Sequence, residues 1–187
     1  MVIDVRRQCI TRVDPTQVGL RYFALSYVWG RVSQLALTTN NIATLTEDQS
    51  LSRLSDALPQ VIKDAMTVVY ELGERYLWVD SLSITQDDAT AKHDLITRMS
   101  EIYANAYLTI CALAGVNASA GLPGVRPYTR VLDTIGNSAG FRVARRPPRL
   151  SKLIFRSHYN KRGWTFQERL LSRRCLFFAN QQVYFQC

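Results

Sequence analysis

The sequence is poor in the side chains that usually hold metal ions. Its 187 residues include only two histidines, His93 and His158. The four cysteines, at positions 9, 111, 175 and 187, form no C-x-x-C pair. Because a zinc site needs clustered Cys and His ligands, we expect no metal site in this chain.

Long apolar segments are also absent. The longest apolar run, YLTICALAGV from Tyr107 to Val116, is shorter than the roughly 20 residues that a helix needs to span a bilayer. The first residues, MVIDVRRQCI, carry charges where a secretory signal needs an apolar segment. We therefore expect a soluble cytoplasmic protein with no membrane partner and with reduced cysteines.

The glycine motifs of common nucleotide-binding folds are missing. No G-x-G-x-x-G and no G-x-x-x-x-G-K-[ST] occurs, which argues against a Rossmann hydride-transfer enzyme and a P-loop NTPase. Gly121 and Gly124 stand in a proline-containing loop instead. The adjacent acids Asp87 and Asp88 lack further ligands and favour a helix cap over a metal site.

Acidic residues are scarce in the last third of the chain. Residues 1–125 carry ten basic and thirteen acidic side chains, a net charge of −3. Residues 126–187 carry thirteen basic and two acidic side chains, a net charge of +11. Such a segment attracts phosphates, nucleic acid or an acidic partner, or it forms a solvated arginine face. Nucleic-acid binding is the least favoured, because the arginines fall partly in a Pro- and Gly-rich loop.

What the sequence does contain is an alternation of apolar runs and amphipathic segments. Apolar runs at 22–28, 76–80 and 107–113 predict three buried strands. Between them, apolar spacing over 58–72 predicts a helix with Pro59 at its first position and Gly73 after its end. A second helix, capped by Asp87 or Asp88, is predicted to run to about Asn105. This order predicts an α/β fold, with a central, mostly parallel sheet flanked by helices.

The remaining segments complete a predicted single domain of residues 1–187. The 25 or so residues after Gly30 are polar and predict irregular structure with one short strand at Leu35–Thr38. Residues of about 114–150 are rich in Gly and Pro and predict a loop-rich insertion. Structure is expected to resume at Lys152–Phe155, followed by a short helix from Trp164 to Leu171. The runs RCLFF and VYFQ then predict a pair of closing C-terminal strands.

Candidate binding residues follow the first two predicted strands. In open α/β sheets, ligands bind beyond the carboxyl ends of the strands. The candidates are Ser26, Tyr27, Trp29 and Gly30 after the first strand, and Asp80, Ser81 and Gln86 after the second. Gly30 would allow a tight turn or a close approach to a ligand. The alternative is structural: Asp80 and Ser81 cap a turn, and Trp29 fills the core.

Four long blocks resemble the fungal heterokaryon incompatibility (HET) domain. They are YFALSYVWG, LPQVIKDAMTVVYELGERYLWVDSLSITQDD, IYANAYLTICALAGVNASAGL and RGWTFQERLLSRRCLFF, in family order from about Asp4 to Cys187. The resemblance implies an intracellular fungal protein of non-self recognition and programmed cell death. Ser83 stands where the family usually has cysteine, which argues against a thiol mechanism there. HET proteins often continue further, so we expect a domain fragment or a short gene product.

HET domains in turn resemble Toll/interleukin-1 receptor (TIR) domains, some of which hydrolyse NAD at the nicotinamide–ribose bond. This resemblance implies a TIR- or flavodoxin-like sheet and a W-x-x-x-E pattern, which WTFQE at Trp164–Glu168 matches. In a helix, Trp164 and Glu168 share one face. The resemblance implies that Glu168 is catalytic, that Trp164 stacks on a ring and that Asp80 shapes the site. NAD would then be a substrate, and no cofactor is expected.

Two alternatives to catalysis by Glu168 stay open at this point. The carboxylate could form a structural ion pair with a tertiary arginine, since four of them, at 156, 162, 173 and 174, flank the helix. The domain could also be a non-catalytic signalling module that triggers death by self-association or with a partner signalling domain.

Overall fold

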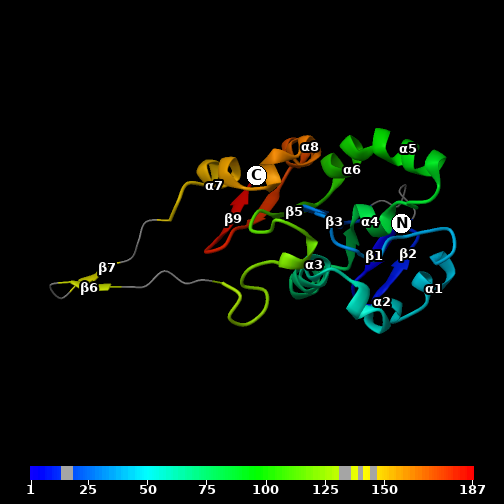
Figure 1. Cartoon of the computed structure of the whole chain (residues 1–187), viewed down its shortest axis with the longest axis horizontal. Coiled ribbons are helices and arrows are strands. Elements are labelled where there is room, and N and C mark those ends of the chain that lie inside the picture. The colour runs from blue at the N-terminus through cyan, green and yellow to red at the C-terminus, as the bar shows by residue number, and fades with distance from the viewer. Residues whose placement is uncertain (14–18, 131–135, 139–140, 144–146) are drawn as a thin grey trace.

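A seven-stranded mixed sheet forms the centre of the protein (Figure 1). The computed structural model describes residues 1–13, 19–130, 136–138, 141–143 and 147–187. The strand order is β2-β1-β4-β3-β5-β8-β9. The strands are β1 (Val2–Asp4), β2 (Cys9–Thr11), β3 (Tyr22–Ser26), β4 (Tyr76–Trp78), β5 (Leu108–Ala112), β8 (Cys175–Phe178) and β9 (Val183–Gln186).

The four central strands run parallel, which confirms the predicted α/β sheet. β3 pairs in parallel with both β4 and β5, and β5 pairs in parallel with β8. The chain runs from β3 to β4 on one side of it and then crosses to β5 on the other side. The direction in which strands are added therefore reverses at β3. This order is that of flavodoxin-like sheets. The outer strands are antiparallel, β1 against β4 and β9 against β8.

Alternating side chains of the parallel strands serve the two faces of the sheet. On β3, Phe23 and Leu25 join the core beneath helix α3 (Gln60–Glu71), whereas Ala24 packs on the opposite face. That opposite face is covered by α5 (Ala89–Thr97), α6 (Met99–Asn105) and α8 (Gly163–Leu171), as Figure 1 shows. Because side chains alternate along a strand, Ser26 at the end of β3 lies on the same face as Ala24.

Helix α3 follows the predicted apolar spacing. Val61, Ile62, Ala65 and Val69 recur at three- and four-residue intervals and are all buried. Pro59 stands at the N-cap, one residue earlier than predicted. Gly73 adopts a φ of +76° after the helix, as expected of a glycine that ends a helix.

Two predictions about local structure were wrong, and one hairpin was missed. The segment after Gly30 is not irregular throughout but contains α1 (Ile42–Thr46), α2 (Ser50–Arg53) and the 3₁₀ helix η1 (Ser55–Ala57). No strand forms at Leu35–Thr38, because the backbone of Leu37 pairs with the loop after β4 through Ser81 and Gln86. The hairpin β1–β2 was not predicted at all.

The second predicted helix exists but is broken. Asp88 is its N-cap and accepts hydrogen bonds from the amides of Thr90 and Ala91. Arg98, with φ −96° and ψ 3°, separates α5 from α6. One further turn, α4 (Asp80–Ser83), begins two residues after β4 ends and was missed because it spans only four residues.

The loop-rich insertion contains more structure than the sequence predicted. It includes the 3₁₀ helix η2 (Ala118–Ala120) and two short strands, β6 (Gly136–Ser138) and β7 (Phe141–Val143), which pair as a separate sheet away from the main one (Figure 1). The segment Lys152–Phe155 belongs to helix α7 (Leu150–Arg156), and the 3₁₀ helix η3 (Tyr159–Lys161) leads to α8. The predicted helix α8 and the closing pair β8–β9 are confirmed.

Two expectations about the whole chain can be compared with the structure. All four cysteines are free thiols, and three of them are buried. Among the described residues, no helix has both the length and the apolar character that a bilayer crossing requires.

Candidate functional site

A cavity of about 260 Å³ opens beyond the carboxyl ends of β3 and β4, beneath α8. Six of the nine residues proposed from the sequence line it: Tyr27, Trp29, Asp80, Gln86, Trp164 and Glu168. Ser26 and Ser81 lie behind this lining and are fully buried, and Gly30 lies outside it. The fold therefore brings residues from three distant parts of the chain to one place.

Glu168 reaches the cavity from the inner face of α8. Its side chain is buried, with 8% of its surface exposed, and its carboxylate accepts a hydrogen bond from the hydroxyl of Ser26. The same hydroxyl lies 2.5 Å from the hydroxyl of Tyr159. Because a hydroxyl has one proton, Tyr159 donates to Ser26 while Ser26 donates to the ionised carboxylate.

Burial controls the acidity of Glu168. The pKa of the carboxyl group is raised from 4.5 to about 7, chiefly by the loss of water around it, and the nearby charge of Asp80 acts in the same direction. The hydrogen bond from Ser26 and the charge of Arg162 act the other way. The result is a carboxyl group that changes its charge near neutral pH, as catalytic carboxyl groups often do.

The alternative of a structural ion pair is not what the structure shows. In the described part of the chain, no arginine or lysine lies within salt-bridge distance of Glu168. Arg162 influences it only through its charge. The partner of Glu168 is therefore a serine hydroxyl and not an arginine.

Asp80 forms the second acidic group of the cavity. One carboxylate oxygen accepts a hydrogen bond from the backbone N–H of Ser81 at 2.7 Å. The other accepts one from the indole N–H of Trp29 at 2.8 Å. Burial raises the pKa of Asp80 from 3.8 to about 6, against the lowering effect of these hydrogen bonds. Asp80 is the first residue of α4, whose N-cap is Val79, and its carboxylate lines the cavity.

Trp29 is not a plain core residue. Its ring stacks on Tyr27 with 6.5 Å between ring centroids and 21° between planes, and its N–H orients Asp80. Tyr27 in turn donates to the hydroxyl of Ser81 at 3.2 Å. These contacts give the acidic side of the cavity a rigid aromatic support.

Ser81, Gln86 and Gly30 have structural contacts that account for them. The side-chain amide of Gln86 donates to the carbonyl oxygens of Asp80 and Ile84, each at 3.1 Å, and so holds the loop after β4. Gly30 has a φ of +70°, and a Cβ atom there would lie 2.3 Å from the Cβ of Asn117. Glycine is required at this position by a close approach of the chain to itself.

Sequence reasoning missed the cations and the apolar wall of the cavity. Lys92, Arg162, Ile84, Ile96 and Met99 also line it. The one sequence feature that pointed toward this wall was the position of Met99 on the apolar face of the second predicted helix. Trp164 lies at the rim with 52% of its surface exposed. The cavity therefore combines two carboxylates, two cations and an apolar wall, a composition suited to a ligand with charges of both signs.

Among the described residues, no group of His, Cys, Asp and Glu is arranged to hold a metal ion.

The fold and this site together define an α/β domain with flavodoxin-like strand order and an acidic cavity beside the point where that order reverses. The sequence pattern of the family described as heterokaryon incompatibility protein (HET) matches residues 22–168, and the chain belongs to that family. The matched region begins at β3 and ends at Glu168, so it contains all the residues that line the cavity.

A curated protein is also similar to part of this chain. Heterokaryon incompatibility protein 6, OR allele, of Neurospora crassa is 27% identical over 134 residues. The alignment covers 68% of this chain and 18% of the relative, so the chain spans less than a fifth of that protein. No solved structure matches the chain.

Proposed function

We propose that this HET domain is a fungal cell-death effector that hydrolyses NAD or NADP at the bond between nicotinamide and ribose. The observation that carries the proposal is the position of Glu168, a buried carboxyl group with a pKa near neutrality, in a cavity beside a second carboxylate. The W-x-x-x-E spacing of α8 and the resemblance to TIR domains support the same reaction.

The reaction suits an ionised carboxylate. The bond between the ring nitrogen and ribose C1′ breaks, and its electron pair leaves with nicotinamide, which becomes neutral. The ribose ring develops positive charge in the transition state, and a nearby carboxylate stabilises that charge. Water then bonds to C1′ and loses a proton, giving ADP-ribose. Because the leaving ring already carries a positive charge, Glu168 needs to donate no proton to it.

The other lining residues have roles that follow from their chemistry. Trp164, Ile96 and Met99 provide an apolar surface on which the nicotinamide ring can pack, away from water. Arg162 and Lys92 are the cations of this cavity. Ser26 orients Glu168, and Trp29 orients Asp80.

The test is NAD consumption by the purified chain. Glu168→Gln removes the charge and keeps the size of the side chain, and we expect turnover to fall by about 100-fold or more. Glu101→Gln, which changes an exposed acid on α6, is the matched control and should keep wild-type turnover. Circular dichroism checks that both variants fold. Equal turnover in wild type and Glu168→Gln, or no turnover by folded protein even in concentrated or assembled samples, would contradict the proposal.

A second candidate function is a non-catalytic module that triggers death by self-association. It is favoured by three apolar side chains that α8 presents to solvent: Trp164, Phe166 and Leu170, with 52%, 51% and 65% of their surfaces exposed. This function predicts that Phe166→Ser abolishes both self-association and toxicity, while Glu168→Gln remains toxic. Toxicity that is lost in Glu168→Gln and kept in Phe166→Ser would reject it.

A further inference from the structure

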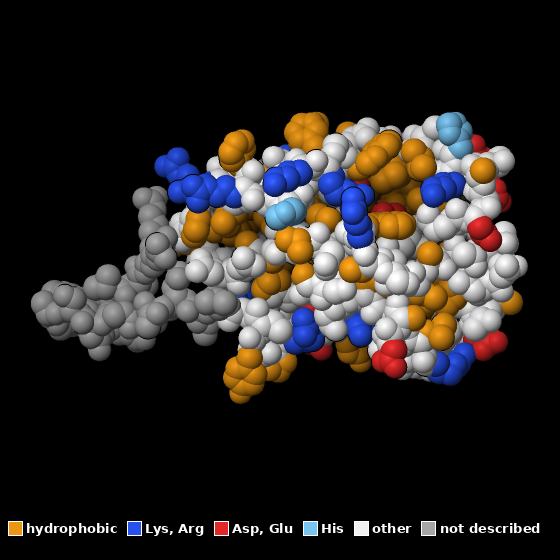
Figure 2. All heavy atoms as spheres, in the orientation of Figure 1, with side chains coloured by type: hydrophobic (Ala, Val, Ile, Leu, Met, Phe, Trp, Pro, Cys, Tyr) orange, Lys and Arg blue, Asp and Glu red, His pale blue; other side chains and the backbone are white. Residues whose placement is uncertain are grey.

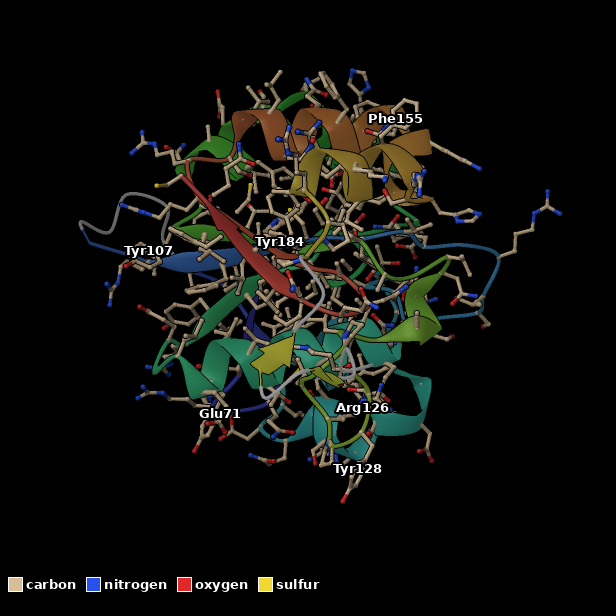
Figure 3. All side chains as sticks on the ribbon, turned by 90° about the vertical axis from the view of Figure 1, so that its left-hand side faces the viewer. Glu71, Tyr107, Arg126, Tyr128, Phe155 and Tyr184 are labelled. Atoms are coloured by element: carbon tan, nitrogen blue, oxygen red, sulfur yellow. The ribbon has the colours of Figure 1, made fainter. Side chains whose placement is uncertain are left out.

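A second cavity lies beyond the carboxyl ends of the other two parallel strands. It has a volume of about 580 Å³. Leu113 and Ala114 line it directly after β5, and Ala179 and Asn180 line it directly after β8. Further walls come from α7, from Tyr184 on β9, and from Thr129 and Pro148 of the insertion. Figure 3 shows Tyr184 on the strand that crosses the middle of this side of the molecule, below α7.

The charged side chains of this cavity differ from those of the first, which holds two carboxylates beside two cations. Its described lining contains no aspartate or glutamate, and its two ionisable basic side chains are Arg156 and His158. Neither side chain forms an ion pair or a hydrogen bond with a described residue, and the same holds for the amide of Asn180. Figure 2 shows Lys and Arg side chains along the upper edge of the face it depicts, where Figure 1 places α7 and α8. An arginine and an imidazole without partners among the described residues, in a cavity whose described lining has no carboxylate, suit a phosphate-bearing ligand.

The apolar part of the cavity suits the rest of such a ligand. Leu113, Leu153 and Pro148 line it together with the ring of Tyr184, whose hydroxyl donates to the Pro148 carbonyl at 2.6 Å. A surface of this kind can pack against a base or a sugar, while Asn180 and the nearby hydroxyl groups can pair with their polar edges. The combination of cations, amides and apolar side chains is that of a nucleotide site.

One short segment connects the two cavities. Arg156, Ser157 and His158 line the basic cavity, and Arg162 lines the acidic one. The Cα atoms of His158 and Arg162 are at most about 14 Å apart, because four residues of chain reach no further. Tyr159, between them, is buried and contacts Ser26, which binds Glu168. The protein thus presents two carboxylates, then Arg162, then Arg156 and His158 along one edge of the sheet.

We propose that the basic cavity binds the adenosine diphosphate half of a dinucleotide whose nicotinamide half occupies the acidic cavity. This inference rests on the proposed function. The order of charges matches NAD, in which a cationic ring is followed by an anionic diphosphate and an uncharged adenosine. Arg156 and His158 therefore determine specificity for dinucleotides, and a nicotinamide mononucleotide would leave their cavity empty.

Direct binding tests the basic cavity without relying on turnover. ADP is titrated into the purified full chain by isothermal calorimetry, because ADP lacks the bond that is cleaved. We expect binding that Arg156→Ala weakens by about ten-fold or more, the size of a lost charge-assisted hydrogen bond. Arg173→Ala removes an exposed arginine outside the cavity and controls for the change in net charge. Failure of ADP to bind, equal weakening by both substitutions, or a larger effect from Arg162→Ala would overturn the inference.

Turnover separates this inference from the proposed function. In Arg156→Ala and His158→Ala, we expect a raised KM for NAD with little change in kcat, and an unchanged KM for nicotinamide mononucleotide. If ADP binding depends on Arg156 but the wild type consumes no NAD, the basic cavity stands as a nucleotide site and the proposed function fails. If NAD is consumed with a KM that neither substitution changes, the hydrolase stands and the dinucleotide site is wrong.

Discussion

At the scale of single residues, the structure explains why a basic segment keeps a carboxylate. The arginines that surround Glu168 in sequence mostly face solvent, whereas Glu168 points inward from α8 toward the end of β3. There it accepts a hydrogen bond from the hydroxyl of Ser26, which in turn contacts the hydroxyl of Tyr159, and both of these side chains are buried. A buried carboxyl group without a cationic partner is destabilising when it is charged. Such a cost is commonly tolerated at functional sites.

The raised pKa of Glu168 makes the stability of the protein depend on pH. Its folded value of about 7 stands above its ordinary value of 4.5, so folding favours the protonated form. The associated stability is complete below about pH 4.5 and is lost as the pH rises through about 7, by on the order of 3 kcal/mol in total. In urea denaturation, Glu168→Gln should therefore lose less stability than wild type between pH 5 and pH 8. Asp80, whose pKa is raised to about 6, titrates in both proteins, and Glu168→Gln also removes the repulsion between the two carboxylates. Identical pH slopes for the two proteins would show that Glu168 titrates normally.

At the scale of elements, α5 is the least firmly packed wall of the acidic cavity. It contributes Lys92 and Ile96 to the lining, yet none of its residues is fully buried. The break at Arg98 also separates it from α6, whose Tyr103 is buried against Trp78. Its start depends on the carboxylate of Asp88, which accepts from two amides at 3.0 Å.

Removing the cap should loosen this wall. We expect Asp88→Ala to lower the free energy of unfolding by about 1 kcal/mol, because two amides at the helix start lose their partner. Asp94→Ala, an exposed site in the same helix with the same change in charge, should have little effect on stability. Thermal denaturation gives the comparison, and hydrogen exchange of α5 amides locates the change. If both variants were equally stable, α5 would be held by packing and not by its cap.

At the scale of the whole molecule, the two faces of the sheet carry different features. The face with α5, α6 and α8 forms the acidic cavity, and the face with α3 anchors the insertion. Asp64 of α3 is buried and accepts from the amide of Leu122 at 2.7 Å and from Arg126 at 3.0 Å. Gly121 allows this approach, since a Cβ atom there would lie 2.5 Å from the Asp64 carboxylate. Figure 3 shows Arg126 over the helices of this layer, with Tyr128 pointing away.

This anchor should matter for both stability and the basic cavity. We expect Asp64→Ala to lower the free energy of unfolding by on the order of 3 kcal/mol, because a buried amide and a guanidinium lose their acceptor. The substitution should also weaken ADP binding, since Thr129 of the basic cavity follows the anchored segment. Asp56→Ala, an exposed aspartate on η1, is the control. Wild-type stability in Asp64→Ala would mean that the insertion contributes nothing to the fold.

The sequence by itself determined the elements whose signals are local. The spacing of Val61, Ile62, Ala65 and Val69 predicted α3, and the alternation of strands and helices predicted the parallel sheet. The helical register also placed Trp164 and Glu168 on one side of α8, since residues four apart share a face. Short elements such as α4 and the hairpin β1–β2 gave too little periodicity to be predicted.

Only the tertiary structure decided which side chains meet. Ser26 and Glu168 are 142 positions apart, and Trp29 and Asp80 are 51 apart, so no local pattern links them. The pKa of each carboxyl group depends on how completely the surrounding elements exclude water, which is a property of packing. The charge separation between the two cavities likewise arises because the sheet brings four strand ends to one edge. The sequence supplied the carboxylates and the arginines, and the order of the strands placed both carboxylates and Arg162 in one cavity and Arg156 in the other.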